Sequence, residues 1–89
     1  MSATVSTLSA SDLFAMLDRD FRRQARQCTK CYFSMPYRLF ASPRDPGNWS
    51  VIPSSTCSHY CEAMLDDVVS KYRSTYRLSD TGRFHAVGR

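Results

Sequence analysis

The hydrophobic positions in the first third of the chain repeat with the period of an α-helix. The apolar residues that define the repeat lie four positions apart: Leu13, Leu17 and Phe21. Residues at this spacing share one face of a helix, and no glycine or proline interrupts residues 11–27. Ser9 and Ser11 are candidate N-caps, and Ser9-x-x-Asp12 resembles a capping box. The pattern therefore predicts a helix over about residues 11–27 with one buried face.

A second helical pattern occupies the last third. Its apolar residues are again four apart: Tyr60, Met64, Val68, Tyr72 and Tyr76. Proline, serine and threonine fill residues 53–56, and serine and threonine are residues that cap helix N-termini. We therefore expect a helix from residue 56 or 57 to residue 76, with an apolar stripe along it.

The segment between the helices has the pattern of short strands. Residues 32–41 are rich in aromatic side chains that favour strands, and Pro36 restricts that strand to an edge or a bulge. Residues 42–48 hold proline, aspartate, glycine and asparagine, which are typical of turns. Residues 49–52 form a second apolar run, so we expect a loose hairpin.

The two ends of the chain carry no such pattern. Residues 1–9 are rich in serine, threonine and alanine, and we expect them to be disordered. Residues 78–89 are basic and contain two glycines, which predicts a flexible tail. One domain over residues 10–77 remains between them.

Length and composition then restrict the class of protein. An 89-residue chain has a marginal core, and domains of this size often need a metal or disulfides for stability. No run of eighteen apolar residues is present, so we expect no membrane span. The first ten residues have neither a basic residue nor an apolar core, so no signal peptide is expected. These features predict an intracellular protein, in the cytoplasm or nucleus, with reduced thiols.

The four cysteines are the strongest chemical signal. Cys28 and Cys31 have the spacing C-x2-C, whereas Cys57 and Cys61 have C-x3-C and would share one face of the second helix. Zinc prefers four soft ligands in a tetrahedron, and a closed site of four cysteine thiolates is a common structural solution. The sequence therefore predicts one structural Zn²⁺ bound by all four cysteines. Four thiolates and one Zn²⁺ would lower the formal charge of the chain from +4 to +2.

Three alternatives remain for the cysteines. His59 could replace a cysteine ligand if Cys57 lies before the helix, because on a helix His59 points away from both neighbouring cysteines. Two disulfides would require an oxidising compartment. A redox pair of Cys28 and Cys31 would normally be found in a βαβ unit, which the pattern does not predict.

The predicted order of a cysteine turn, a hairpin and a helix carrying two cysteines resembles the treble-clef zinc finger, over about residues 28–76. The resemblance implies an α+β, zinc-stabilised fold: an N-terminal helix, a cysteine turn, a β-hairpin and a long C-terminal helix. It differs from the usual pattern because no glycine follows Cys31 and the second pair has C-x3-C spacing. Treble clefs serve many functions, so the resemblance implies none in particular.

The sequence favours binding over catalysis. A closed zinc site leaves no position for a substrate, and no phosphate loop or nucleophile–base pair is recognisable, so we expect neither enzyme activity nor a small-molecule substrate. We predict an adaptor or regulator that contacts a partner protein, with nucleic-acid binding as the alternative. The candidate contact residues are basic or aromatic: Arg19, Arg23, Arg26, Lys71, Arg73, Arg77, Tyr37 and Trp49.

The placement of these residues distinguishes the two functions. One continuous exposed patch of arginine and lysine would favour nucleic acid, whereas a dominant exposed aromatic surface with scattered charges would favour a protein.

Overall fold

The computed structural model describes residues 6–40 and 47–79, and it contains two helices and four short strands. Helix α1 spans Ala10–Gln24, and the Ser9 side chain accepts a hydrogen bond of 3.2 Å from the backbone N–H of Asp12. The predicted capped helix is thus present, although it ends three residues earlier than expected. Its buried residues are the predicted ones: Leu13, Leu17 and Phe21.

Helix α2 spans His59–Thr75, and the Ser58 side chain caps it by accepting from the backbone N–H of Cys61 at 3.2 Å. The predicted start at residue 56 or 57 is therefore too early. Cys57 lies in the turn before the helix, so it does not share a helical face with Cys61 as expected. The helix ends where Tyr76 adopts an extended conformation and begins the next strand.

Strands β2, Tyr37–Arg38, and β3, Trp49–Ser50, form the expected hairpin. They pair antiparallel, with Tyr37 opposite Ser50 and Arg38 opposite Trp49. The backbone N–H of Leu39 extends the pairing by donating to the carbonyl of Asn48 at 2.7 Å.

Strands β1, Ser6–Leu8, and β4, Tyr76–Leu78, form a second sheet that the sequence pattern does not predict. They pair parallel, with Leu8 opposite Leu78. Residues 6–8 are therefore extended and paired, in contrast to the disorder expected for residues 1–9. Leu78 is buried and belongs to the core rather than to a tail, whereas residues 1–5 and 80–89 lie outside the described residues.

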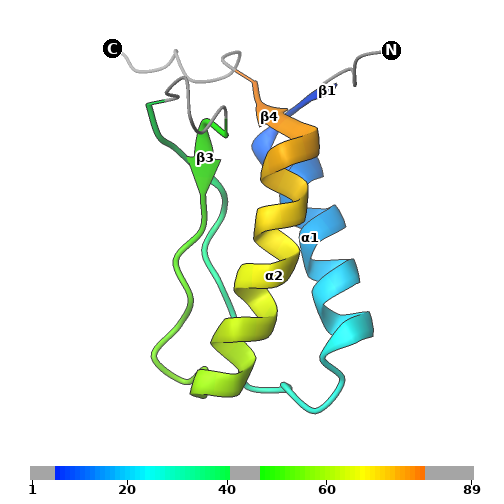
Figure 1. The fold of residues 1–89 in the computed structure, drawn as a ribbon, viewed down its shortest axis with the longest axis vertical. Helices are drawn as coiled ribbons and strands as arrows, with labels where there is room; N and C mark the ends of the chain where they lie inside the picture. The colour runs from blue at the N-terminus through cyan, green and yellow to red at the C-terminus, as the bar shows by residue number, and fades with distance from the viewer. Residues whose placement is uncertain (1–5, 41–46, 80–89) are drawn as a thin grey trace.

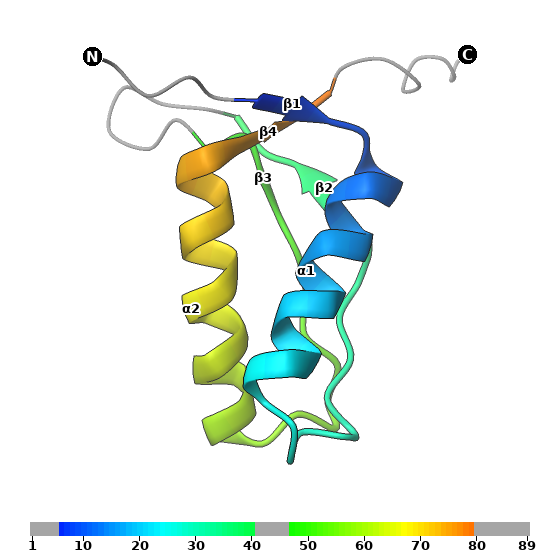
Figure 2. The same cartoon turned by 90° about the vertical axis from the view of Figure 1, so that its right-hand side faces the viewer.

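The two helices run antiparallel, side by side, and the hairpin packs beside them (Figures 1 and 2). β1 and β4 lie at one end of the helices, and the turns after α1 and before α2 lie at the other. The core is formed where the helices and the hairpin meet, and its largest fully buried side chains are Trp49, Phe21, Leu13, Leu17, Leu65 and Val68. The α+β class is confirmed.

A polar contact also joins the two helices. The hydroxyl of Tyr72 on α2 donates a hydrogen bond to the carboxylate of Asp20 on α1. Burial of the phenol, together with the hydrogen bond to Asp20 and the negative charge of that carboxylate, raises the pKa of Tyr72 to about 12.

Candidate functional site

The four cysteines form two disulfides, one between Cys28 and Cys61 and one between Cys31 and Cys57. Each bond joins the turn after α1 to the region where α2 begins. The C-x2-C pair does not close on itself; its two cysteines bond to two different positions 33 and 26 residues further along the chain. The two disulfides are therefore nested and hold the same end of both helices together.

The predicted zinc site is wrong, because each sulfur is bonded to another sulfur and has no thiolate to offer a metal. Within residues 6–40 and 47–79, no group of three or more histidine, cysteine, aspartate or glutamate side chains could hold a metal ion. His59 is exposed at the first position of α2. Disulfide cysteines carry no charge, so the formal charge stays at +4. The argument that a closed zinc site excludes catalysis no longer applies.

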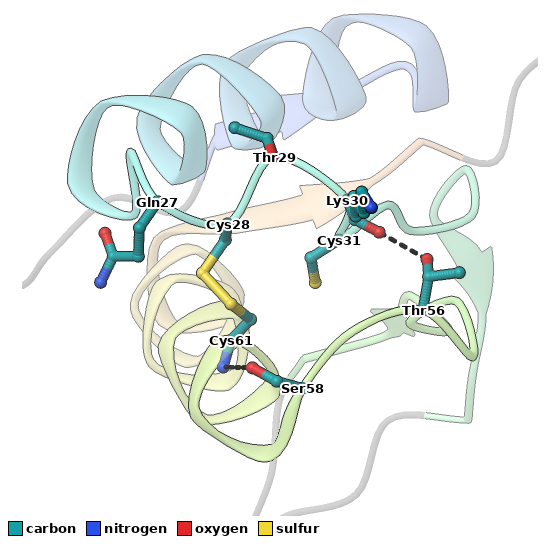
Figure 3. A pocket seen from close by; sticks show the side chains of 8 residues that line it. All are labelled: Gln27, Cys28, Thr29, Lys30, Cys31, Thr56, Ser58 and Cys61. Carbon is teal, nitrogen blue, oxygen red and sulfur yellow. Dashed lines mark hydrogen bonds between the residues drawn. A yellow bond between two sulfur atoms is a disulfide. The ribbon is translucent and has the colours of Figure 1, made fainter.

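A shallow cavity of about 180 Å³ lies at the disulfide end (Figure 3). The Cys28–Cys61 bond forms part of its wall, and the side chain of Cys31 also points toward the turn that carries Thr56. The Thr56 hydroxyl donates to the carbonyl of Lys30 and so links the two turns a second time. The hydroxyl of Thr56 holds the two turns and that of Ser58 caps α2, and the cavity is small, so we assign it a structural role.

The hairpin has one face in the core and one face exposed. Trp49 and Val51 alternate along one strand and are buried. Successive residues of a strand point to opposite faces, so the residues next to Trp49 and Val51 face away from the core. Residues that pair across an antiparallel sheet lie on the same face. This second face holds Tyr37, Leu39, Ser50 and Ile52, and exposed Met35, which precedes buried Pro36, continues it. We use the name outer hairpin face for its four large apolar residues: Met35, Tyr37, Leu39 and Ile52.

All four side chains of the outer hairpin face are apolar and substantially exposed. The exposed fractions are 47% for Met35, 40% for Tyr37, 36% for Leu39 and 59% for Ile52. Neighbouring Tyr32 and Phe40 are also exposed, so most of the large exposed hydrophobic residues of the described chain belong to residues 32–40 and 52. Contiguous exposed apolar surfaces of this kind mark interaction sites.

The two aromatic candidates have different positions. Tyr37, a predicted contact residue, is exposed and lies on the outer hairpin face. Trp49 is fully buried, and its indole N–H donates to the carbonyl of Tyr76 in β4 at 3.0 Å, so it cannot contact a partner. Of the outer hairpin face, only Tyr37 is predicted as a contact residue. Ile52 could have been found from its alternation with Trp49 and Val51, and Met35 and Leu39 from their two-residue spacing from Tyr37.

The basic candidates are spread over several elements. On α1, Arg19 and Arg23 lie 3.9 Å and 3.7 Å from the carboxylate of Asp20. On α2, Lys71 lies 3.5 Å from Asp67, and Arg73 donates to the carbonyl of Gly47 at 3.2 Å. Arg19, Arg23 and Lys71 thus lie beside carboxylates that compete for phosphate.

The remaining two basic candidates, Arg26 and Arg77, are exposed at opposite ends of the molecule.

Acidic residues are distributed asymmetrically. Residues 25–40 and 47–58 contain three basic residues and no acid. Helix α1 carries three aspartates and three arginines, and α2 carries three acids with one lysine and one arginine. The described hairpin and its flanking turns are therefore weakly basic, whereas the acidic and basic residues of each helix nearly balance.

None of the described helices is long and apolar enough to cross a membrane. No family model, curated protein or solved structure matches this chain.

Proposed function

We propose that this protein acts by binding a partner protein through the outer hairpin face. The observation that carries the proposal is an apolar sheet face that no described element of the chain covers. Met35 and Tyr37 belong to the residue types enriched in protein interfaces, and Leu39 and Ile52 extend the apolar area beside them. The core is complete without these side chains, so their exposure on one face is best explained by a partner.

The charge around the face defines the chemistry of the partner. The described hairpin and its flanking turns have three basic residues and no acid, so acidic groups around an apolar centre would complement them. A second copy of the chain is disfavoured, because two hairpin sides would repel each other. Nucleic acid is disfavoured because Tyr37 is the one member of the outer hairpin face that can stack on a base, and because several of the other cations have acidic neighbours.

The disulfides bear on where this binding takes place. Disulfides persist in oxidising compartments and are rare where glutathione and thioredoxin keep thiols reduced. We therefore place the function in an oxidising compartment, such as outside the cell, in place of the cytoplasm or nucleus expected with a zinc site.

Photocrosslinking tests the proposed surface directly. The photoreactive amino acid benzoylphenylalanine replaces Tyr37 or Ile52, and as a control it replaces Tyr60, which is exposed on α2 away from the hairpin. We expect one protein to be crosslinked from positions 37 and 52 and not from position 60. That protein is identified by mass spectrometry and purified for binding measurements with the intact chain.

The purified pair then gives a quantitative test. We expect Ile52→Ser to weaken binding by about fivefold to tenfold, because an apolar side chain is no longer buried. Tyr37→Ser should also weaken binding, whereas Tyr60→Ser should leave the affinity unchanged. Added salt should weaken binding, because it screens the attraction between the basic residues beside the hairpin and the acidic groups of the partner. Equal crosslinking from all three positions, crosslinking to a second copy of this chain, or salt-sensitive binding to random oligonucleotides would each contradict the proposal.

A further inference from the structure

A larger cavity, of about 440 Å³, lies at the end of the molecule opposite the disulfides. It is formed where the end of the hairpin meets the β1–β4 pair. We call it the arginine cavity after two of its lining residues, and the lining side chains used below are Thr7, Arg38, Leu39, Phe40, Arg77 and Leu78. Its volume lies within the roughly 300–1,000 Å³ of pockets that bind small molecules.

Two guanidinium groups reach this cavity from different strands. Arg38 is on β2, and its Nη2 donates to the carbonyl of Ser79 at 3.2 Å, which holds the side chain toward the end of β4. Arg77 is on β4 itself and is exposed. None of the described lining residues is acidic. Guanidinium groups bind carboxylates and phosphates through paired, charge-assisted hydrogen bonds, so the cavity favours an anion.

The rest of the lining is mainly apolar. Leu39, Phe40 and Leu78 form this part of the wall, and the side chain of Phe40 is fully exposed. A second cavity of about 350 Å³ lies against Arg38, Leu39 and Phe40, so the apolar wall continues beyond the first cavity. An anion bound beside this wall gains affinity if it carries an apolar group.

The part of the wall formed by Leu78 is held in place by the side chain of Asn48, which also lines the cavity. The side-chain amide of Asn48 accepts from the N–H of Leu78 at 2.9 Å and donates to its carbonyl at 3.1 Å. This pair of hydrogen bonds fixes the hairpin to β4 and keeps Arg38 and Arg77 on the same side of the molecule. A site that is formed before the ligand arrives loses less entropy on binding.

We propose that the arginine cavity binds a small amphipathic anion, with its carboxylate or phosphate between Arg38 and Arg77 and its apolar chain or ring against Leu39 and Phe40. This site is separate from the surface proposed for the partner protein, apart from Leu39, which borders both.

The test uses NMR titration of the intact protein with simple probes. Octanoate and octyl phosphate carry the required head and chain, octanol and octylammonium lack the anion, and acetate and inorganic phosphate lack the chain. We expect at least one of the two octyl anions to bind saturably and to shift the amide signals of Arg38, Arg77 and Leu78. Octanol, octylammonium and the short anions should bind at least tenfold more weakly. A preference between octanoate and octyl phosphate identifies the head group of the natural ligand.

Variants assign the binding to this cavity. Arg77→Gln should weaken binding of the octyl anion about tenfold, because a charge-assisted hydrogen bond is lost at an exposed residue that the fold does not require. Arg26→Gln removes the same charge at the opposite end of the molecule and should change the affinity less than twofold. Tyr37→Ser, which weakens the proposed protein contact, should leave octyl-anion binding intact.

Several outcomes would overturn the proposal. Equal binding of octanol, or of octylammonium, would show that the arginines do not select an anion. Equal binding of the short anions would remove the role of the apolar wall. An unchanged affinity in both Arg77→Gln and Arg38→Gln, or amide shifts confined to the outer hairpin face, would show that the cavity is not the site.

Discussion

The nested disulfides should stabilise the protein in a strongly non-additive way. In the chain-entropy account, a disulfide stabilises by closing a loop in the unfolded chain. The linked cysteines are 33 and 26 residues apart, and closing either loop alone is worth about 3.5 kcal/mol. When one bond is already present, however, the second closes only a short ring made of the segments 28–31 and 57–61. A ring of about nine residues is worth only about 2.5 kcal/mol.

The perturbation is therefore the removal of the bonds singly and together. Cys28→Ala with Cys61→Ala, or Cys31→Ala with Cys57→Ala, should each lower the free energy of unfolding by about 2.5 kcal/mol. Removing both should lower it by about 6 kcal/mol, since the last bond to be removed closes a long loop. A domain of this length has a total stability of roughly 5–13 kcal/mol, so the quadruple variant should be marginal or unfolded at room temperature.

Urea denaturation followed by circular dichroism measures these free energies, and the slope of the transition should rise as bonds are removed because the unfolded chain expands. The chain-entropy account would be refuted if removing the first disulfide lowered the free energy of unfolding more than removing the second. That result would mean that contacts in the native state, and not loop closure in the unfolded chain, dominate the effect of each bond. If one pair of substitutions changed neither the stability nor the slope, the corresponding bond would not be formed in solution.

Three further substitutions test the contacts that hold the helices. Tyr72→Phe should cost about 1 kcal/mol at pH 7, because the hydrogen bond to Asp20 is lost. Since the pKa of Tyr72 is raised from 10.0 to about 12, its contribution is full below pH 10 and is lost as the pH rises toward 12. The wild type should therefore lose stability over that interval more steeply than Tyr72→Phe in urea denaturation, and parallel profiles would contradict this. Ser58→Ala should lower the free energy of unfolding by about 1 kcal/mol because the α2 N-cap is lost, and should lower the melting temperature accordingly. The control Ser55→Ala, at an exposed residue, should leave the melting temperature unchanged. Equal effects of the two substitutions would show that Ser58 is not the cap. Trp49→Phe should lower the free energy of unfolding by about 2–3 kcal/mol in urea denaturation, because it leaves a gap in the core and an unpaired carbonyl in β4. A loss below about 1 kcal/mol would argue against full burial of Trp49.

The helices are predictable because their signals are local. The four-residue repeat of Leu13, Leu17 and Phe21 and the cap at Ser9 lie within a few turns of one another. The predicted start of α2 is too early because the run of serine and threonine before Ser58 offers several caps of similar quality. Only the packed structure determines which one is used.

The parallel pair β1–β4 and the position of Trp49 could not be predicted in this way. Ser6 pairs with Tyr76, seventy residues away, and a strand of three residues has no periodicity of its own. The burial of Trp49 likewise depends on a carbonyl acceptor in β4. Both features arise from contacts between segments that are distant in the described chain.

The error on the cysteines has a different origin. Two short-spaced pairs bring four sulfurs to the same region whether the product is a zinc site or two disulfides. The cysteine spacing therefore predicts correctly where the chain is cross-linked, but it does not determine whether the cross-link is a metal site or a pair of disulfides. The choice of zinc depends on the expected reducing compartment, which the spacing itself does not encode.

The placement of both covalent links at one end has a consequence for how the molecule opens. The chain between Cys28 and Cys61 stays tethered during any partial opening, whereas the far ends of the helices are joined only by noncovalent contacts and the three-residue pair β1–β4. Fraying should begin there, so amide protons of Leu8 and Leu78 should exchange with solvent faster than those beside the disulfides. Because the arginine cavity lies at this end, occupancy by an anion should slow that exchange and raise the melting temperature.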